Sequence, residues 1–383
     1  MRVAVLGASG FIGSRLVERL HLEEIAEVRP VARRVASLAG PSRFGLDCRV
    51  ADAFDREALA AAFAGCEVIV HAVAGPPRVI LGTLAPVYEA AQRSGVRRIV
   101  YLSTASVHGQ APPIGTTEDS ELSDRQPIAY NNAKVRAERR LLRLRERSTV
   151  ELVLLRPGIV FGPRSTWISS FADALLEDSA SLVDGGRGVC NSLYVDNLID
   201  AIRAAMSAPG ADGEAFLLGD RESVTWADLY RPIALALGVG LASVAEAGTP
   251  TSESSWRERW GRARRSGAVR RMSSMLPRRV RAALTSRSSL EGSALPSSPW
   301  VAPASPKPVA TPELALLYRC GYKLPFDKAS RLLGYEPRVS FDLACRRTVA
   351  WLEFAGYPVM VNGPAAEARR TSMQPPGSCN EVS

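Results

Sequence analysis

The stretch that decides the fold is MRVAVLGASGFIG, residues 1–13. An apolar run at residues 3–6 is followed by three glycines spaced three residues apart and then by an amphipathic helical pattern over residues 11–20. Glycine permits a tight turn and lets backbone N–H groups approach a pyrophosphate, while the start of the helix adds positive potential. The stretch predicts a dinucleotide-binding turn, and the alternative is a tight turn that binds nothing. The contacts are assigned to Gly7, Ser9, Gly10, Phe11, Ile12 and Gly13.

The following residues alternate apolar runs with helical patterns. Runs at 27–32, 68–74, 98–103 and 152–156 are interleaved with helical patterns such as 84–94. Strands that alternate with helices predict right-handed crossovers and a parallel sheet covered on both faces. The expected fold class is α/β, a Rossmann-type doubly wound parallel sheet with a smaller, mixed C-terminal substrate domain.

Composition suggests where this organisation changes. We expect a dinucleotide-binding domain at residues 1–165 plus about 186–206, and a substrate-binding portion at about 166–185 and 207–358. Within the latter, residues 245–310 are rich in Ser, Pro and Arg and indicate an insert. Residues 359–383 are polar and contain proline, which predicts a disordered tail.

The net charge of +9 is concentrated in one segment. Residues 251–290 contain eleven arginines and two acids, so the rest of the chain is neutral overall. We therefore expect no nucleic-acid partner for the fold as a whole. The segment also contains Trp, Met and Leu, which suits weak contact with a membrane surface, binding of a substrate diphosphate or of nucleic acid. The alternative interpretation, a solvated insert beside the substrate cleft, is at least as well supported as these three interpretations together.

Cysteine and histidine usage predicts neither disulfides nor a metal site. Six cysteines are scattered without a Cys-x-x-Cys pair, and three histidines lie far apart. The chain starts directly with the first strand, and no apolar run reaches the ~18 residues of a spanning helix. We expect a cytoplasmic protein with free thiols.

A tyrosine and a lysine four residues apart are the first candidates for chemistry. Tyr130 and Lys134 fall on one face of a helical pattern, where an ammonium group would lower the pKa of the phenol for proton exchange with a substrate hydroxyl or carbonyl. Ser103 and Thr104 follow an apolar strand, and strand carboxyl ends form the ligand crevice of such sheets. Either hydroxyl could polarise a substrate oxygen or cap the turn.

The end of the second strand bears on the coenzyme. An NAD-selective site usually carries an acid there for the ribose hydroxyls, but this chain has Arg33 and Arg34. Two guanidinium groups can pair with a 2′-phosphate, which favours NADP over NAD. The alternative is that both are solvated turn residues.

Taken together, these motifs resemble the extended short-chain dehydrogenase/reductase family, the group of NAD-dependent epimerases and dehydratases that act largely on nucleotide sugars. The glycine pattern, the Tyr130-x-x-x-Lys134 pair and the turn at residues 103–109 match family motifs in order. Further landmarks are Tyr194-Val195-Asp196-Asn197-Leu198 and the segment 328–337. The resemblance implies coenzyme contacts at Asp52, Ala53, Ala72, Ala74, Ser103, Tyr130, Lys134, Pro157, Gly158 and Val160.

The resemblance also implies the chemistry. Hydride would pass between substrate and nicotinamide, Tyr130 would move the proton, and Thr104 would orient the substrate oxygen. Lys134 would hold the nicotinamide ribose and acidify Tyr130. Family dehydratases place an acidic pair after the catalytic Thr, whereas Ala105 and Ser106 stand here, which disfavours dehydration.

The predicted function is an NAD(P)-dependent epimerase or reductase acting on a nucleotide-linked sugar. The alternatives are an NADP-dependent carbonyl reductase or hydroxyl dehydrogenase for a lipid, sterol or polyketide-like substrate, and a dinucleotide-binding regulatory or assembly protein without turnover. The family tendency is a homodimer, formed through helices that include the one carrying Tyr130.

Overall fold

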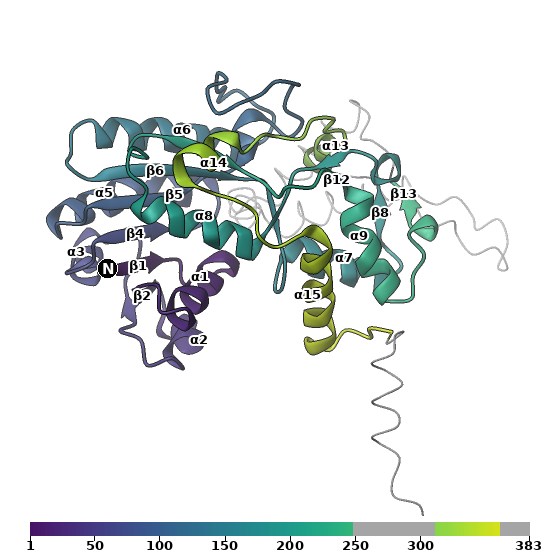
Figure 1. Ribbon diagram of the computed structural model, residues 1–383, viewed down its shortest axis with the longest axis horizontal. Helices are drawn as coiled ribbons and strands as arrows, with labels where there is room; N and C mark the ends of the chain where they lie inside the picture. Colours follow the sequence, from purple (N-terminus) through teal and green to yellow (C-terminus); the bar gives the residue numbers. More distant parts are fainter. Residues whose placement is uncertain (248–310, 361–383) are drawn as a thin grey trace, which may run out of the picture.

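A seven-stranded, all-parallel sheet forms the centre of the computed structural model, which describes residues 1–247 and 311–360 (Figure 1). The strand order is β11-β6-β5-β4-β1-β2-β3. The strands are β1 (Arg2–Leu6), β2 (Glu27–Ala32), β3 (Arg49–Val50), β4 (Val68–His71), β5 (Arg98–Leu102), β6 (Glu151–Pro157) and β11 (Ala215–Leu218). The order reverses between β1 and β4, so the sheet is doubly wound, as predicted.

Helices cover both faces of the sheet. In β1, Val3 and Val5 belong to one apolar cluster, while Ala4 and Leu6 belong to the other, because successive side chains of a strand point to opposite faces. The first face packs against α1 (Phe11–Leu22), α8 (Val195–Ser207) and α14 (Asp327–Leu333). The second packs against α3 (Arg56–Phe63), α5 (Leu84–Arg93) and α6 (Ala129–Arg145). The short helices α2 (Ala39–Ser42) and α4 (Pro77–Gly82) lie in connections.

A smaller mixed unit lies beside the sheet and has its own apolar cluster, centred on Trp226 (Figure 1). Its helices are α7 (Thr166–Leu176), α9 (Trp226–Ala236), α13 (Pro312–Tyr318) and α15 (Phe341–Phe354). Its strands form three two-stranded sheets: β7 (Ile159–Phe161) with β10 (Ser192–Tyr194), β9 (Val189–Cys190) with β12 (Val224–Thr225), and β8 (Ser181–Leu182) with β13 (Ala245–Glu246). Aromatic stacking stabilises it, with ring centroids 4.9 Å apart for Trp226 and Tyr318.

The expected division of the chain differs from the structure at several elements. Strands β7, β9 and β10 fall within the expected dinucleotide-binding residues but pair in the small sheets of the mixed unit, whereas α14, from the expected substrate-binding portion, packs on the central sheet. We placed residues from 207 onward in the substrate-binding portion, but β11 pairs with β6 in the central sheet. The four-residue apolar run of β11 gives no indication of which sheet it joins, and only the long-range pairing decides this. Most of the expected insert and tail, residues 248–310 and 361–383, lies outside the described residues. Met360, near the start of the expected tail, donates its N–H to the carbonyl of Ala236 at 2.7 Å.

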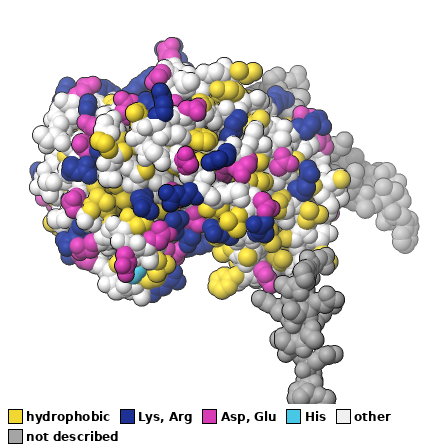
Figure 2. Space-filling view, viewed as in Figure 1, with side chains coloured by type: hydrophobic (Ala, Val, Ile, Leu, Met, Phe, Trp, Pro, Cys, Tyr) yellow, Lys and Arg dark blue, Asp and Glu magenta, His cyan; other side chains and the backbone are white. Residues whose placement is uncertain are grey.

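The face of the described residues drawn in Figure 2 is not uniformly basic. On the side drawn in Figure 2, Lys and Arg side chains are interspersed with Asp and Glu. Within residues 1–247 and 311–360, no helix combines the length and apolar character needed to cross a membrane. The same ranges contain no cluster of three or more His, Cys, Asp or Glu residues suited to a metal ion, and their five cysteines are free thiols.

Candidate active site

A cleft of about 970 Å³ lies where the strand order of the sheet reverses. Parallel sheets bind ligands outside the carboxyl ends of their strands at such a reversal. The sequence-predicted residues that line it are Gly7, Ser9, Gly10, Phe11, Ile12, Gly13, Arg33, Asp52, Ala53, Ala72, Ala74, Ser103, Thr104, Tyr130, Pro157, Gly158 and Val160. Two predicted residues do not line it: Arg34 is exposed at the start of a 3₁₀ turn, and Lys134 is buried behind the cleft wall.

The glycine loop is shaped so that side chains are excluded from it. Gly7 has φ +92°, a left-handed conformation, and a Cβ there would lie 2.9 Å from the carbonyl carbon of Ala72. A Cβ on Gly13 would lie 2.2 Å from the carbonyl oxygen of Gly7. No side chain caps the N-terminus of α1, and its first turn contains no acid. This uncapped, close-packed turn fits the pyrophosphate of a dinucleotide.

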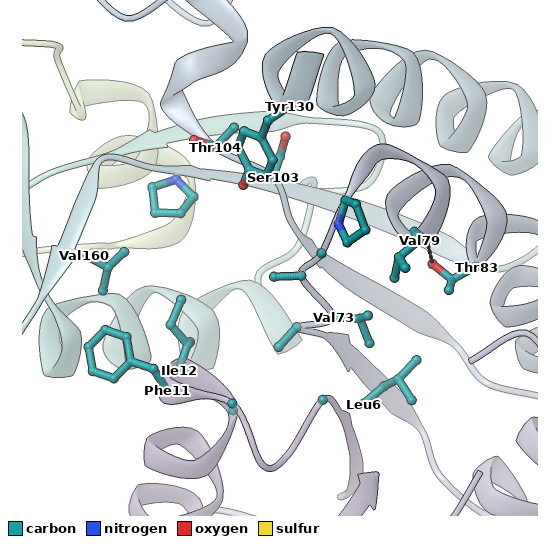
Figure 3. A pocket seen from close by; sticks show the side chains of 18 of the residues that line it. Leu6, Phe11, Ile12, Val73, Val79, Thr83, Ser103, Thr104, Tyr130 and Val160 are labelled. Atoms are coloured by element: carbon teal, nitrogen blue, oxygen red, sulfur yellow. Dashed lines mark hydrogen bonds between the residues drawn. The ribbon is translucent and has the colours of Figure 1, made fainter. Parts of the chain in front are cut away.

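Tyr130, Thr104 and Ser103 lie next to one another on one wall, and Phe11 and Ile12 lie across the cleft from them (Figure 3). Tyr130 is at the start of α6, while the two hydroxyl residues follow β5. Thr104 Oγ1 accepts the N–H of Ser106 at 3.2 Å, which leaves its O–H free to donate. Ser103 Oγ instead donates to the buried carboxylate of Glu138. The geometry therefore favours Thr104 over Ser103 as the hydroxyl that orients a substrate oxygen.

We expected the ammonium group of Lys134 to lie beside the phenol of Tyr130, but in the structure it bonds to other groups. Its Nζ donates to the carbonyl of Leu102 at 2.7 Å and lies 3.2 Å from the hydroxyl of Tyr101, whose ring it also faces. Burial lowers the pKa of Lys134 to about 8. The pKa of Tyr130 is raised by burial, with a further contribution from Glu313, so the expected lowering of this pKa is wrong for the structure. The four-residue spacing correctly placed the two residues on one helix, but β5 determines which groups the ammonium contacts.

A buried ionic network lies directly behind this wall. Arg156 on β6 donates to the Glu138 carboxylate through Nη2 at 2.7 Å and through Nε at 3.2 Å. Its Nη1 donates to the carbonyl of Glu118 at 2.9 Å and lies 3.2 Å from Nε2 of His108. Burial, reinforced by Arg156, lowers the pKa of His108 to about 4, so its imidazole is neutral at physiological pH. The network fixes the loop after β5, which carries the hydroxyl groups of Ser103 and Thr104.

Several residues that line the cleft were not found from the sequence. Arg78 follows β4, and the presence of a cation after an apolar strand could have identified it from the sequence as a cleft residue. Gln110, Trp167, Glu313 and Leu317 come from a loop, from α7 and from α13. No local pattern marks them, because distant segments of the chain bring them to the cleft.

The fold and this site define a dinucleotide-dependent enzyme of the Rossmann type. Residues 3–219 match the model of the NAD dependent epimerase/dehydratase family, and the chain belongs to that family. It is accordingly an enzyme of the NAD(P)-dependent oxidoreductase and epimerase type, which confirms the resemblance inferred from its motifs.

Relatives in this family have diverse activities. A UDP-glucose 4-epimerase of Mycolicibacterium smegmatis is 30% identical over 268 residues, covering 62% of this chain and 83% of that protein. A 3-beta-hydroxysteroid dehydrogenase of Mycolicibacterium neoaurum is 28% identical over 270 residues, covering 64% and 73%. A 3-diazoavenalumate denitrifying reductase of a Streptomyces species is 33% identical over 235 residues, covering 54% and 73%.

Solved structures share the fold. The UDP-glucose 4-epimerase of Thermotoga maritima, solved with UDP-glucose, superposes with a TM-score of 0.64 at 20% identity, covering 93% of this chain and 99% of that one. The dTDP-glucose 4,6-dehydratase of Bacillus anthracis, solved in complex with NAD, gives 0.67 at 17% identity, covering 93% and 97%. At these identities the comparison establishes the Rossmann-type architecture.

Proposed function

We propose that this protein is an NAD(P)-dependent epimerase or reductase in which Tyr130 transfers a proton to or from a substrate oxygen held by Thr104. The observation that carries the proposal is that Tyr130, Thr104 and the uncapped glycine turn line one cleft at the reversal of the sheet. When bound, the coenzyme supplies or accepts the hydride. Because burial raises the pKa of Tyr130, the phenol is protonated at neutral pH, which suits donation to a carbonyl oxygen.

The coenzyme contacts follow from the same geometry. The start of α1 would hold the pyrophosphate, and Asp52 would contact the adenine end of the dinucleotide. Arg33 lines the cleft at the end of β2, where no acid is present, and this favours NADP over NAD. Lys134 would hold the nicotinamide ribose from its buried position behind the cleft wall, where its ammonium group is bonded to the carbonyl of Leu102 on β5.

For the substrate, a nucleotide-linked sugar is the first candidate, because UDP-glucose 4-epimerases are among the relatives. A second candidate is a hydroxyl or carbonyl group on an apolar molecule, as the steroid dehydrogenase relatives suggest. The specific support for the second is the apolar character of Ile159, Val160, Trp167 and Leu317 in the cleft.

The test compares wild type with Tyr130→Phe. Both are assayed for interconversion of UDP-glucose and UDP-galactose, and for NADH- or NADPH-dependent reduction of a panel of ketones. Removing a proton-transfer group should lower kcat by about 10²–10⁴-fold, while coenzyme affinity measured by fluorescence stays within about threefold. The matched control is Tyr357→Phe, a tyrosine bonded to Asp173 that does not line the cleft. Undiminished turnover in Tyr130→Phe, or no coenzyme binding by the wild type, refutes the proposal.

A further inference from the structure

A second cleft lies between α1 and α15, at the junction of the central sheet with the mixed unit (Figure 1). We term it the junction cleft. Its volume is about 720 Å³, which is within the range of small-molecule sites. Phe11 is the only described residue that lines both the junction cleft and the cleft that contains Tyr130. The junction cleft is therefore a separate space, and the proposed reaction does not use it.

The junction cleft carries an excess of positive charge, because six arginines and four acidic residues line it. All four carboxylates are bonded to arginines. Asp196, for example, is 3% exposed and accepts from Arg15 at 2.6 and 3.0 Å. This pairing leaves Arg164 and Arg338 without an ion pair among the described residues. The other pairs are Glu18 with Arg43, Glu23 with Arg19 and Asp200 with Arg19.

Three exposed arginines of the junction cleft are available to a ligand. Arg164 has φ +72°, a left-handed conformation that is uncommon for a residue with a side chain, and it donates to the hydroxyl of Ser14 on α1 at 3.2 Å. The backbone N–H of Arg338 donates to Asn197 Oδ1 on α8 at 3.1 Å, while its guanidinium is unpaired. Arg347 on α15 is 47% exposed and meets a carboxylate at 3.4 Å. Guanidinium groups that are not fully paired bind phosphate oxygens well.

Aromatic side chains lie on the same wall as Arg347. Trp351 and Phe354 follow it by four and seven residues along α15, so the three side chains project from one face of the helix. Phe354 is 88% exposed, and Trp351 is partly exposed. Aromatic rings can stack on a nucleobase while neighbouring arginines bind its phosphate. The wall thus combines the two kinds of contact that a nucleotide requires.

We propose that the junction cleft binds a nucleoside phosphate, with the phosphate held by the three exposed arginines and the base stacked on the aromatic face of α15. A ligand in this position would bridge α1, which packs on the central sheet, and α15, which belongs to the mixed unit. The proposal goes beyond the proposed reaction and does not depend on it, because the two clefts have different walls.

The experiment is isothermal titration calorimetry of wild type with GMP, inorganic phosphate and guanosine. We expect GMP to bind at least about tenfold more tightly than the other two, because it alone engages both the arginines and the rings. Binding of GMP should survive saturation with NADPH and with NADH, which fill the other cleft. Arg338→Gln should weaken both GMP and inorganic phosphate about tenfold, as the loss of one charge-assisted hydrogen bond predicts. Phe354→Ser should weaken GMP about fivefold or more and leave inorganic phosphate unchanged.

Arg346→Gln is the matched control, because Arg346 is exposed on the same helix, pairs with Asp342 and does not line the junction cleft. It should bind GMP as wild type does. Three results would each overturn the proposal: GMP binding no tighter than guanosine or not at all, affinity unchanged by Arg338→Gln or by Phe354→Ser, and displacement of GMP by coenzyme. Tyr130→Phe should also bind GMP as wild type does, so turnover and GMP binding test the proposed function and this site separately.

Discussion

Glu138→Gln should destabilise the protein strongly, because it removes the charge that compensates a buried arginine. The side chains of Arg156 and Glu138 are 6% and 2% exposed. The guanidinium makes three hydrogen bonds of 2.7–3.2 Å to the carboxylate. Removing one partner of a buried pair leaves an uncompensated charge and typically costs about 3–5 kcal/mol. The Ser103 hydroxyl would also lose its charged acceptor, so the loop carrying Thr104 would be less well positioned.

The free energy of unfolding in urea, followed by tryptophan fluorescence and circular dichroism together, measures this cost. Asp124→Asn is the matched control, because Asp124 pairs with the half-exposed Arg136 and Arg139 on the same helix as Glu138. Exposed pairs contribute about 0–1 kcal/mol. The double variant Glu138→Leu with Arg156→Met should regain most of the loss, since neither charge of this pair remains buried. A cost for Glu138→Gln as small as that for Asp124→Asn would refute the reasoning.

Three further outcomes follow from the site. Gly13→Val should weaken coenzyme binding about tenfold or more, because overpacking costs about 1–3 kcal/mol. Titration with NADPH and NADH checks this against Gly40→Ala, a position with open space around it, and equal affinities would contradict it. Burial lowers the pKa of Lys134 to about 8, so between about pH 8 and 10 the unfolded chain retains a proton that the folded protein has lost. Stability contributed by this group should therefore rise with pH in that window, and the difference between wild type and Lys134→Met in urea unfolding should show the rise; a flat difference would count against it. Arg33→Asp should shift the ratio of NADPH to NADH affinity towards NADH by at least about tenfold, as expected for one charged hydrogen bond, and an unchanged ratio would show that Arg33 is a solvated turn residue.

The cleft wall formed by Ser103, Thr104 and Tyr130 shows which parts of the site can be predicted from the sequence. The strand before Ser103 and the helix carrying Tyr130 were identifiable from apolar runs and helical periodicity, and the structure brings both to one cleft. The groups around them were not identifiable. Tyr101 occupies the position beside Lys134 that we had expected Tyr130 to take, because β5 and α6 pack at a register that neither segment encodes alone.

The sequence by itself determined the features that depend on neighbouring residues. The glycine turn, the strand–helix alternation and the spacing of Tyr130 and Lys134 are local patterns, since backbone geometry links each residue to those within one or two turns. Tertiary structure alone decided that β11 joins the central sheet, that Arg156 neutralises Glu138, and that Gln110 meets Glu313 across 203 positions of the chain. Those contacts join segments whose separation in sequence carries no periodic signal, so only the packing of the sheet and the mixed unit brings them together.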